Sequence, residues 1–174
     1  MALLDDVTAA LRAARIDSAL IGAAALAVHG VSRSTADQDL LVTDPRVLTA
    51  ALWAGLAASA RCDIRRGDAD DPLAGVVRIT RENERDVDVI VGRDAWQRDT
   101  IDRAVPFGER GVRVVTTADL VLLKLFAGGS QDRWDIEQVL ALDTGTATRE
   151  DVERRLPALP ARCREMWDRV REER

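Results

Sequence analysis

Residues 21–42 read IGAAALAVHGVSRSTADQDLLV and decide the fold of the chain. A buried strand leads to Gly22 and a short alanine-rich helix, and Asp37 and Asp39 then lead into a second strand. Because side chains alternate between the two faces of a strand, the two aspartates project to the same face. Carboxylates this close repel each other unless a cation lies between them, so the pair predicts a site for Mg²⁺ and a phosphate-bearing ligand.

Gly22 lies between a strand and a helix, where backbone N–H groups point outward and favour an anion. A residue without Cβ also lets a phosphate approach these donors closely. Glycine is equally common in plain tight turns, so Gly22 gains its weight from the two aspartates that follow it. The order of glycine turn and paired carboxylates indicates nucleotide chemistry.

The run RDVDVIVG at residues 85–92 supplies a third carboxylate. Two-metal phosphoryl transfer needs ligands for both ions and a base near the attacking hydroxyl. Asp86 and Asp88 share one face of an expected strand at 87–91, and Asp88 lies deeper in its apolar part, where a charge needs a partner. We assign the third-ligand role to Asp88 and keep Asp86 in reserve. The alternative is that both residues solvate an exposed strand edge.

Hydrophobic periodicity and turn signals predict the remaining elements. Helices are expected at residues 3–15, 23–28, 44–58, 94–104, 117–127, 131–142, 149–156 and 160–173. Strands are expected at residues 18–21, 39–42, 62–65, 75–80, 87–91 and 112–115. The fold class is therefore α+β, with a mixed, twisted sheet flanked by helices. A change of character near residue 116 predicts an α/β core at 1–116 and a helical C-terminal subdomain at 117–174.

The composition restricts the class of protein. A chain of 174 residues with 47% hydrophobic content can bury a core of its own. No apolar run approaches the roughly 18 residues of a membrane span, and the N-terminus is acidic and amphipathic, so we expect a cytoplasmic protein without a membrane partner. A net charge of −5 speaks against extended binding to nucleic-acid backbones. Cys62 and Cys163 lack metal-site spacing and are expected to be reduced structural thiols.

Lys124 is the single lysine of the chain and lies in the apolar run DLVLLKLFAGG. Its ammonium must reach water or an anion, because an unpaired buried charge is costly. Two interpretations stay open. Lys124 contacts a phosphate, or it extends to water or pairs with Asp132 or Asp135. His29, the single histidine, falls at a helix end, where an imidazole commonly bonds to carbonyls instead of taking part in catalysis.

The order of these features resembles the nucleotidyltransferase superfamily related to DNA polymerase beta. The pattern is a strand, a glycine, a short helix ending in His-Gly, then R-x-T-x-D-x-D and an apolar strand, within about residues 17–142. It is most similar to the minimal bacterial branch that includes AbiEii-type toxins of type IV toxin–antitoxin systems. The resemblance implies that Asp37, Asp39 and Asp88 hold two Mg²⁺ ions. It also implies that a nucleoside triphosphate donates a nucleotidyl group to a hydroxyl.

The resemblance further implies contacts to the triphosphate. Ala23 and Ala24 stand where the family has a second glycine or a serine, so the backbone N–H groups of Gly22 and Ala23 are the expected donors. Arg33 lies between the turn and the aspartates and is expected to reach the triphosphate, whereas the alternative is a solvated loop arginine. Lys124 is similar to the lysine on a helix of the toxin branch.

The sequence and the resemblance together lead to three functional hypotheses. The first is a Mg²⁺-dependent nucleotidyltransferase, which the resemblance links to a toxin whose partner is an antitoxin. The second is a catalytically degenerate nucleotide-binding module or toxin–antitoxin partner, which the alanines after Gly22 favour. The third is a small-molecule nucleotidyltransferase of the aminoglycoside type, which agrees with the acidic charge. The sequence leaves open the nucleotide, the acceptor (RNA, protein or small molecule), the oligomeric state and the roles of Asp86, Asp132 and Asp135.

Overall fold

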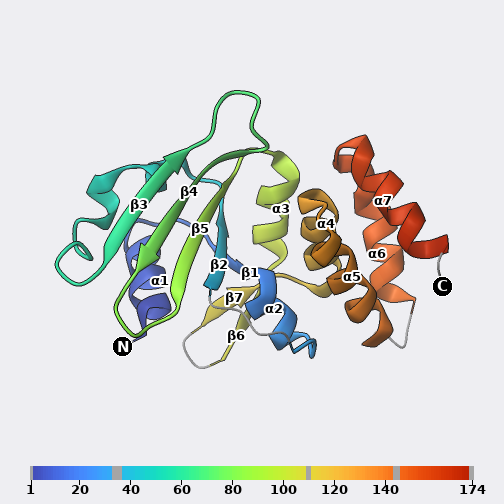
Figure 1. The fold of residues 1–174 in the computed structure, drawn as a ribbon, viewed down its shortest axis with the longest axis horizontal. Helices are drawn as coiled ribbons and strands as arrows, with labels where there is room; N and C mark the ends of the chain where they lie inside the picture. Colours follow the sequence, from blue (N-terminus) through green and yellow to red (C-terminus); the bar gives the residue numbers. More distant parts are fainter. Residues whose placement is uncertain (1, 33–36, 109–110, 143–145, 173–174) are drawn as a thin grey trace. The chain divides into compact units, whose positions relative to one another are not determined.

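A computed structural model describes residues 2–32, 37–108, 111–142 and 146–172. Its strands are β1 (Ala19–Ile21), β2 (Asp37–Val42), β3 (Arg61–Arg66), β4 (Leu73–Thr80), β5 (Asp86–Gly92), β6 (Val105–Phe107) and β7 (Val112–Val114). Its α-helices are α1 (Leu3–Ala13), α2 (Gly22–Val28), α3 (Ala95–Arg103), α4 (Thr117–Ala127), α5 (Ser130–Leu142), α6 (Ala147–Arg155) and α7 (Ala161–Glu172). Figure 1 shows these elements along the chain. The architecture is α+β, as the sequence predicts.

The chain divides into two compact units. The first comprises residues 1–24 and 34–115, and the second comprises residues 25–33 and 116–174. The sequence places the change at residue 116 and assigns the segment 25–33 to the first part. In the structure that segment belongs with the C-terminal helices, where the Nδ1 atom of His29 lies 3.2 Å from the hydroxyl oxygen of Thr117.

The first unit contains one mixed seven-stranded sheet in the order β3-β4-β5-β2-β1-β7-β6. Strands β2 and β5 are parallel, as are β1 and β7, and the other neighbours are antiparallel. The strands predicted at 62–65, 75–80 and 87–91 are confirmed, and they form the antiparallel hairpins β3–β4 and β4–β5. The parallel pair β2–β5 brings together two segments about fifty positions apart in sequence, and this pair positions the candidate site.

One face of three neighbouring strands is apolar. It carries Leu40 and Val42 of β2, Val77 and Ile79 of β4, and Val87, Val89 and Val91 of β5, all at most 1% exposed. Helix α1 buries Leu3, Val7 and Leu11 and contacts β5; Figure 1 shows it behind β4 and β5. Because side chains alternate along a strand, the charged residues of β2 and β5 are left on the other face.

The α-helix predicted over residues 44–58 is wrong. The structure has two short 3₁₀-helices, Pro45–Leu48 and Ala50–Trp53, separated at Thr49 by extended backbone (φ −118°, ψ 135°). The side chain of Asp44 accepts a hydrogen bond from Arg46 N at 2.9 Å, which starts the first turn. The indole N–H of Trp53 donates to the Val47 carbonyl at 2.7 Å. This tertiary contact fixes a tighter path than helix propensity favours.

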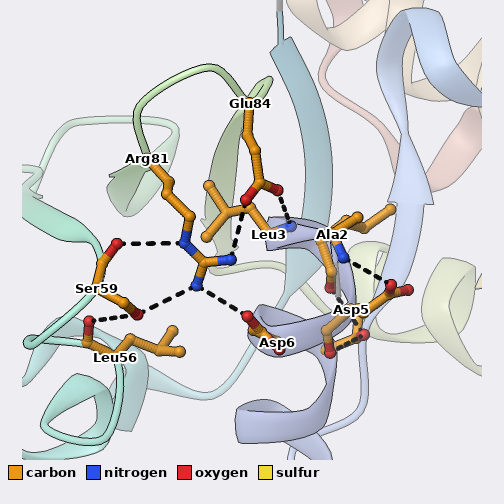
Figure 2. Close-up of polar contacts among 10 residues, drawn as sticks. Ala2, Leu3, Asp5, Asp6, Leu56, Ser59, Arg81 and Glu84 are labelled. Carbon is orange, nitrogen blue, oxygen red and sulfur yellow. Dashed lines mark hydrogen bonds and ion pairs between the residues drawn. The ribbon is translucent and has the colours of Figure 1, made fainter.

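Arg81 joins the turn between β4 and β5 to its surroundings (Figure 2). Its guanidinium pairs with Asp6 of α1 at 2.8 Å and with Glu84 of the same turn at 3.2 Å. It also donates to the Ser59 carbonyl at 3.2 Å. Glu84 in turn accepts a hydrogen bond from the backbone N–H of Leu3 at the start of α1. These contacts fix the hairpin whose two strands carry the charged side chains described below.

The second unit is helical, and α4 contacts α5, α6 and α7. The side chain of Thr116 caps α4 by accepting from Asp119 N at 3.2 Å, and Gly128 ends the helix with a left-handed backbone (φ 77°). The buried carboxylate of Asp119 also accepts from the Thr116 hydroxyl and pairs with Arg155 at 3.1 Å. None of the helices in the described ranges has both the length and the apolar character needed to cross a membrane.

Candidate functional site

Four aspartates lie on one face of the sheet where β2 meets β5. The parallel register pairs Asp37 with Asp86 and Asp39 with Asp88. Cross-strand partners in such a ladder point to the same face. The structure therefore brings Asp88, and Asp86 beside it, to the side of the sheet that carries the first aspartate pair. This is the arrangement that the sequence analysis requires for a shared ligand, and the metal-binding role itself stays a prediction.

Gly22 lies directly against the carboxylate of Asp39. Strands β1 and β2 pair Ile21 with Asp39, and Gly22 then turns with a left-handed backbone (φ +63°). A Cβ atom placed on Gly22 would meet Asp39 Oδ2 at 1.9 Å, far inside van der Waals contact. Glycine is therefore favoured at position 22 for a second cause besides phosphate access: the left-handed turn and the adjacent carboxylate leave no room for a Cβ atom. Ala23 follows in the first turn of α2 and is buried.

Arg78 of β4 is the positively charged partner of these carboxylates. Its Nε and Nη2 atoms donate to the two oxygens of Asp88 at 2.9 and 2.6 Å, a bidentate contact. The same Nη2 lies 3.6 Å from Asp37 Oδ2. The hydrogen bond and charge of Asp88 raise the pKa of the Arg78 guanidinium. The Arg78 side chain is 47% exposed, whereas the side chain of Asp88 is only 12% exposed.

Arg78 is not among the site residues predicted from the sequence, although the sequence contains a pattern that indicates its pairing with Asp88. Positions 78 and 88 lie at the same sequence distance on either side of Asn83, which has a positive φ of 61° at the turn. A hairpin centred on Asn83 places Arg78 opposite Asp88, and the observed β4–β5 register does pair them. The pairing could have been predicted from the symmetry of the RITRENERDVD run once a hairpin was assumed.

The donor set fits a magnesium site, with one obstacle. Carboxylate oxygens are the ligands that Mg²⁺ prefers, and four aspartates share this face. Yet within residues 2–32, 37–108, 111–142 and 146–172, no group of three His, Cys, Asp or Glu side chains is placed to hold a metal ion as it stands. Arg78 engages both carboxylate oxygens of Asp88, so a metal ion at Asp88 would compete with Arg78.

A pocket of about 470 Å³ opens beside Asp88 and Arg78, over strands β3 and β4. It is lined by Asp63, Arg65, Arg66, Gly67, Asp71, Pro72, Leu73, Gly75, Val76, Arg78 and Asp88. Asp63 of β3 is the cross-strand partner of Arg78 and lies on the same face of the sheet. Its carboxylate is 45% exposed and lies 3.5 Å from Arg65. Arg78 therefore has carboxylates on both sides, Asp88 on β5 and Asp63 on β3.

Arg33 and Lys124 are the two further predicted phosphate contacts. Arg33 falls outside the residues that the structure describes. Lys124, in the second unit, pairs with Asp132 and with Asp135, each at 2.8 Å. This ion pair is the alternative that the sequence left open for Lys124, and its phosphate contact stays a prediction.

No family model matches the chain, and no curated protein matches it. Solved structures do. One is an antigenic nucleotidyltransferase-like protein from Paracoccidioides brasiliensis, with a TM-score of 0.52 and 16% identity over 96% of this chain and 89% of the other. Another, from H. pylori, is provisionally named a nucleotidyltransferase, with a TM-score of 0.50 and 14% identity over 95% of this chain and 92% of the other. At such identities the likeness concerns the fold, and the chain has the nucleotidyltransferase fold.

Proposed function

We propose that the chain is a Mg²⁺-dependent nucleotidyltransferase that moves a nucleotidyl group from a nucleoside triphosphate to a hydroxyl acceptor. The observation that carries this proposal is the register of β2 and β5, which sets Asp88 beside Asp39 on one face. The close approach of Gly22 to Asp39 adds support, because it gives the glycine turn and the carboxylates one shared geometry. The fold of the chain agrees with this activity.

In this proposal Asp37, Asp39 and Asp88 hold the metal. Bound Mg²⁺ neutralises the triphosphate and polarises the reacting phosphate. The acceptor oxygen bonds to the α-phosphorus while the bond from that phosphorus to the bridging oxygen breaks, so pyrophosphate leaves. The hydroxyl proton passes to a carboxylate oxygen of Asp88, which is the least exposed carboxylate in contact with Arg78. The backbone N–H groups of Gly22 and Ala23, with Arg33 and Lys124, remain the proposed phosphate contacts.

The activity is tested by incubating the protein with Mg²⁺ and each labelled ribonucleoside triphosphate, together with acceptor pools of RNA, protein and hydroxyl-bearing small molecules. Asp39→Asn should abolish both labelled product and pyrophosphate release. Asp70→Asn is the matched control, because Asp70 is an exposed loop carboxylate outside the site, and it should retain activity. Equal product from wild type and Asp39→Asn, or none from wild type with any acceptor, would contradict the proposal.

The contact between Arg78 and Asp88 favours one second candidate, a degenerate module that binds nucleotide without transferring it. In that case Arg78 substitutes permanently for the metal at Asp88. Calorimetric titration with a triphosphate separates the two. Binding that requires Mg²⁺ and is lost in Asp37→Asn supports the enzyme, and binding that is independent of the metal supports the module.

The toxin assignment is a finer proposal that rests on the sequence resemblance alone. Expression of the wild type should arrest growth of a bacterial host, and Asp39→Asn should relieve the arrest. Co-expression of a protein encoded next to this chain should restore growth if that neighbour is an antitoxin. Growth unaffected by the active wild type would instead direct the search for the acceptor to small molecules.

A further inference from the structure

We propose that Arg78 is an exchangeable counter-ion of the metal site: it holds Asp88 and Asp37 while no metal is bound, and it moves to Asp63 when the metal enters. Arg78 is thus a positioning residue that sets the affinity of the site for its metal. This inference rests on the proposed function, because it takes Asp88 as a metal ligand.

The first step is the competition at Asp88. Arg78 donates to both of its carboxylate oxygens, at 2.9 and 2.6 Å, and its Nη2 also lies near Asp37 at 3.6 Å. A metal ion that binds Asp88 needs at least one of those oxygens. A guanidinium beside a divalent cation is also repelled by it. Metal binding therefore competes with the bidentate Arg78–Asp88 contact.

The second step is a destination for the displaced side chain. Asp63 faces Arg78 across the antiparallel β3–β4 ladder, on the opposite side from Asp88. Facing residues in such a ladder have Cβ atoms about 5 Å apart, within reach of an arginine side chain. The pocket of about 470 Å³ lies between these groups and gives the guanidinium space to turn. Among the described residues Asp63 forms an ion pair with Arg65 alone, in a loose contact of 3.5 Å between two well-exposed groups, so Asp63 can accept a second guanidinium.

The third step is the energetic scale of the exchange. The Arg78 side chain is 47% exposed, so water partly screens its contact with Asp88, whose own side chain is 12% exposed. The interaction energy of a divalent cation with several carboxylates is more favourable than that of a single guanidinium. The exchange keeps the carboxylates neutralised in both states, since like charges this close are otherwise unfavourable.

The test measures metal affinity directly, without nucleotide or acceptor. The probe is Mn²⁺ alone, which also prefers carboxylate oxygens, and its free ion gives an electron paramagnetic resonance signal that is lost on binding. Arg78→Gln should bind Mn²⁺ about five- to tenfold more tightly than wild type. Arg61→Gln is the matched control: Arg61 lies on the same sheet face, paired in register with Thr80, and its loss changes the net charge equally. Its affinity should stay within about twofold of wild type.

Arg78→Lys distinguishes the effect of losing the bidentate contact with Asp88 from the effect of losing a positive charge. Lysine keeps the positive charge but cannot bind both oxygens of Asp88 in the bidentate manner. The exchange predicts tighter Mn²⁺ binding in this variant too, whereas a pure charge effect predicts no change. Arg78→Lys also keeps the test decisive if Arg78→Gln does not fold.

Asp63→Asn tests the destination. It should weaken Mn²⁺ binding by about two- to fivefold in the wild-type background. In the Arg78→Gln background this effect should disappear, because no guanidinium remains to be received. An equal weakening in both backgrounds would mean that Asp63 acts only through its charge, and it would overturn the exchange.

The outcomes also separate this inference from the proposed function. Equal Mn²⁺ affinity in wild type, Arg78→Gln and Arg78→Lys, with nucleotidyl transfer still observed, overturns the inference and leaves the function standing. Absence of Mn²⁺ binding in every variant contradicts both. Tighter binding in both Arg78 variants, with Arg61→Gln unchanged, supports the exchange even where no acceptor has been found.

Discussion

In each unit of the molecule a cation bridges two aspartates, Arg78 in the first and Lys124 in the second, and their environments are opposite. In the sheet unit, Arg78 joins Asp88 to Asp37, and the Arg78 side chain is 47% exposed. In the helical unit, Lys124 joins Asp132 of α5 to Asp135 one turn later, with the Lys124 side chain 13% exposed and the Asp135 side chain fully buried.

The difference lies in what replaces the cation when it is lost. In the sheet unit the exposed Arg78 side chain has a second carboxylate, Asp63, within reach, so this cation can be exchanged. Asp135 has no access to water, and removal of its partner leaves a buried charge that is costly. The buried cluster therefore serves stability, and the exposed cluster is suited to binding. The following predictions test this contrast, from the largest expected effect to the smallest.

Lys124→Ala should lower the free energy of unfolding by about 3–5 kcal/mol, because Asp135 loses its counter-ion inside the helical unit. Chemical denaturation measures the loss. Asp132→Asn is the control, since it leaves the buried Lys124–Asp135 contact in place and should cost about 1 kcal/mol. The double variant Lys124→Met with Asp135→Leu should recover most of the loss. A small effect of Lys124→Ala would show that this cluster is as exchangeable as the one in the sheet.

Gly22→Ala should lower the free energy of unfolding by about 1–3 kcal/mol and also abolish metal binding. The backbone at position 22 is left-handed, which is unfavourable for a residue with a Cβ atom. The new Cβ would also meet Asp39 Oδ2 at 1.9 Å, so the carboxylate must move. Denaturation and Mn²⁺ titration measure the two effects. Gly55→Ala is the control, because a Cβ on Gly55 meets nothing within 4 Å and should change neither quantity. Normal metal binding in Gly22→Ala would argue against Asp39 as a ligand.

Arg78→Gln should cost about 1 kcal/mol of stability or less, because the Arg78 side chain is 47% exposed and its charge is screened by water. High salt should remove even this difference by screening the charges. Denaturation at low and high ionic strength measures it. A loss as large as that of Lys124→Ala would mean that Arg78 is a structural residue, and it would weaken the contrast between the two clusters.

Glu84 should make a small, pH-dependent contribution to the hairpin that carries Arg78 and Asp88. The backbone N–H of Leu3, followed by Arg81, holds the pKa of Glu84 below its ordinary value of 4.5. A lowered carboxyl pKa gives stability that is present above 4.5 and is lost as the pH falls through the lowered value. The difference in thermal midpoint between wild type and Glu84→Gln should therefore shrink on acidification.

Glu82→Gln is the control for this titration, since Glu82 lies exposed in the same turn and no hydrogen bond or ion pair joins it to the described residues. Its thermal midpoint should follow that of the wild type at every pH. A pH-independent difference for Glu84→Gln would show that the contact with Leu3 is not retained in solution.

The placement of the carboxylates could be predicted from the sequence because it depends on a short-range rule. Alternation along two strands fixes which face Asp37, Asp39 and Asp88 occupy. For the three carboxylates to lie together, the two strands had only to be neighbours in the sheet, and the structure shows that they are. The helical C-terminal part followed equally from local periodicity and from Gly128.

The features that were missed depend on contacts that hydrophobic periodicity does not encode. In the 3₁₀ path of residues 45–53, the indole of Trp53 donates to the Val47 carbonyl six residues before it. Strand β6 was missed because Pro106 argues against a strand, yet β6 lies at the edge of the sheet, where proline is tolerated. The role of Arg78 depends on the β4–β5 register, which the sequence suggests only when the turn at Asn83 is recognised.

The pairing of β2 with β5 has a consequence for how the protein matures. A slip of β2 by one residue in this ladder would turn Leu40 towards water and send Asp39 into the hydrophobic layer. The misaligned chain would be unstable, and its aspartates would no longer share one face. A molecule that folds stably has therefore already aligned its acidic residues.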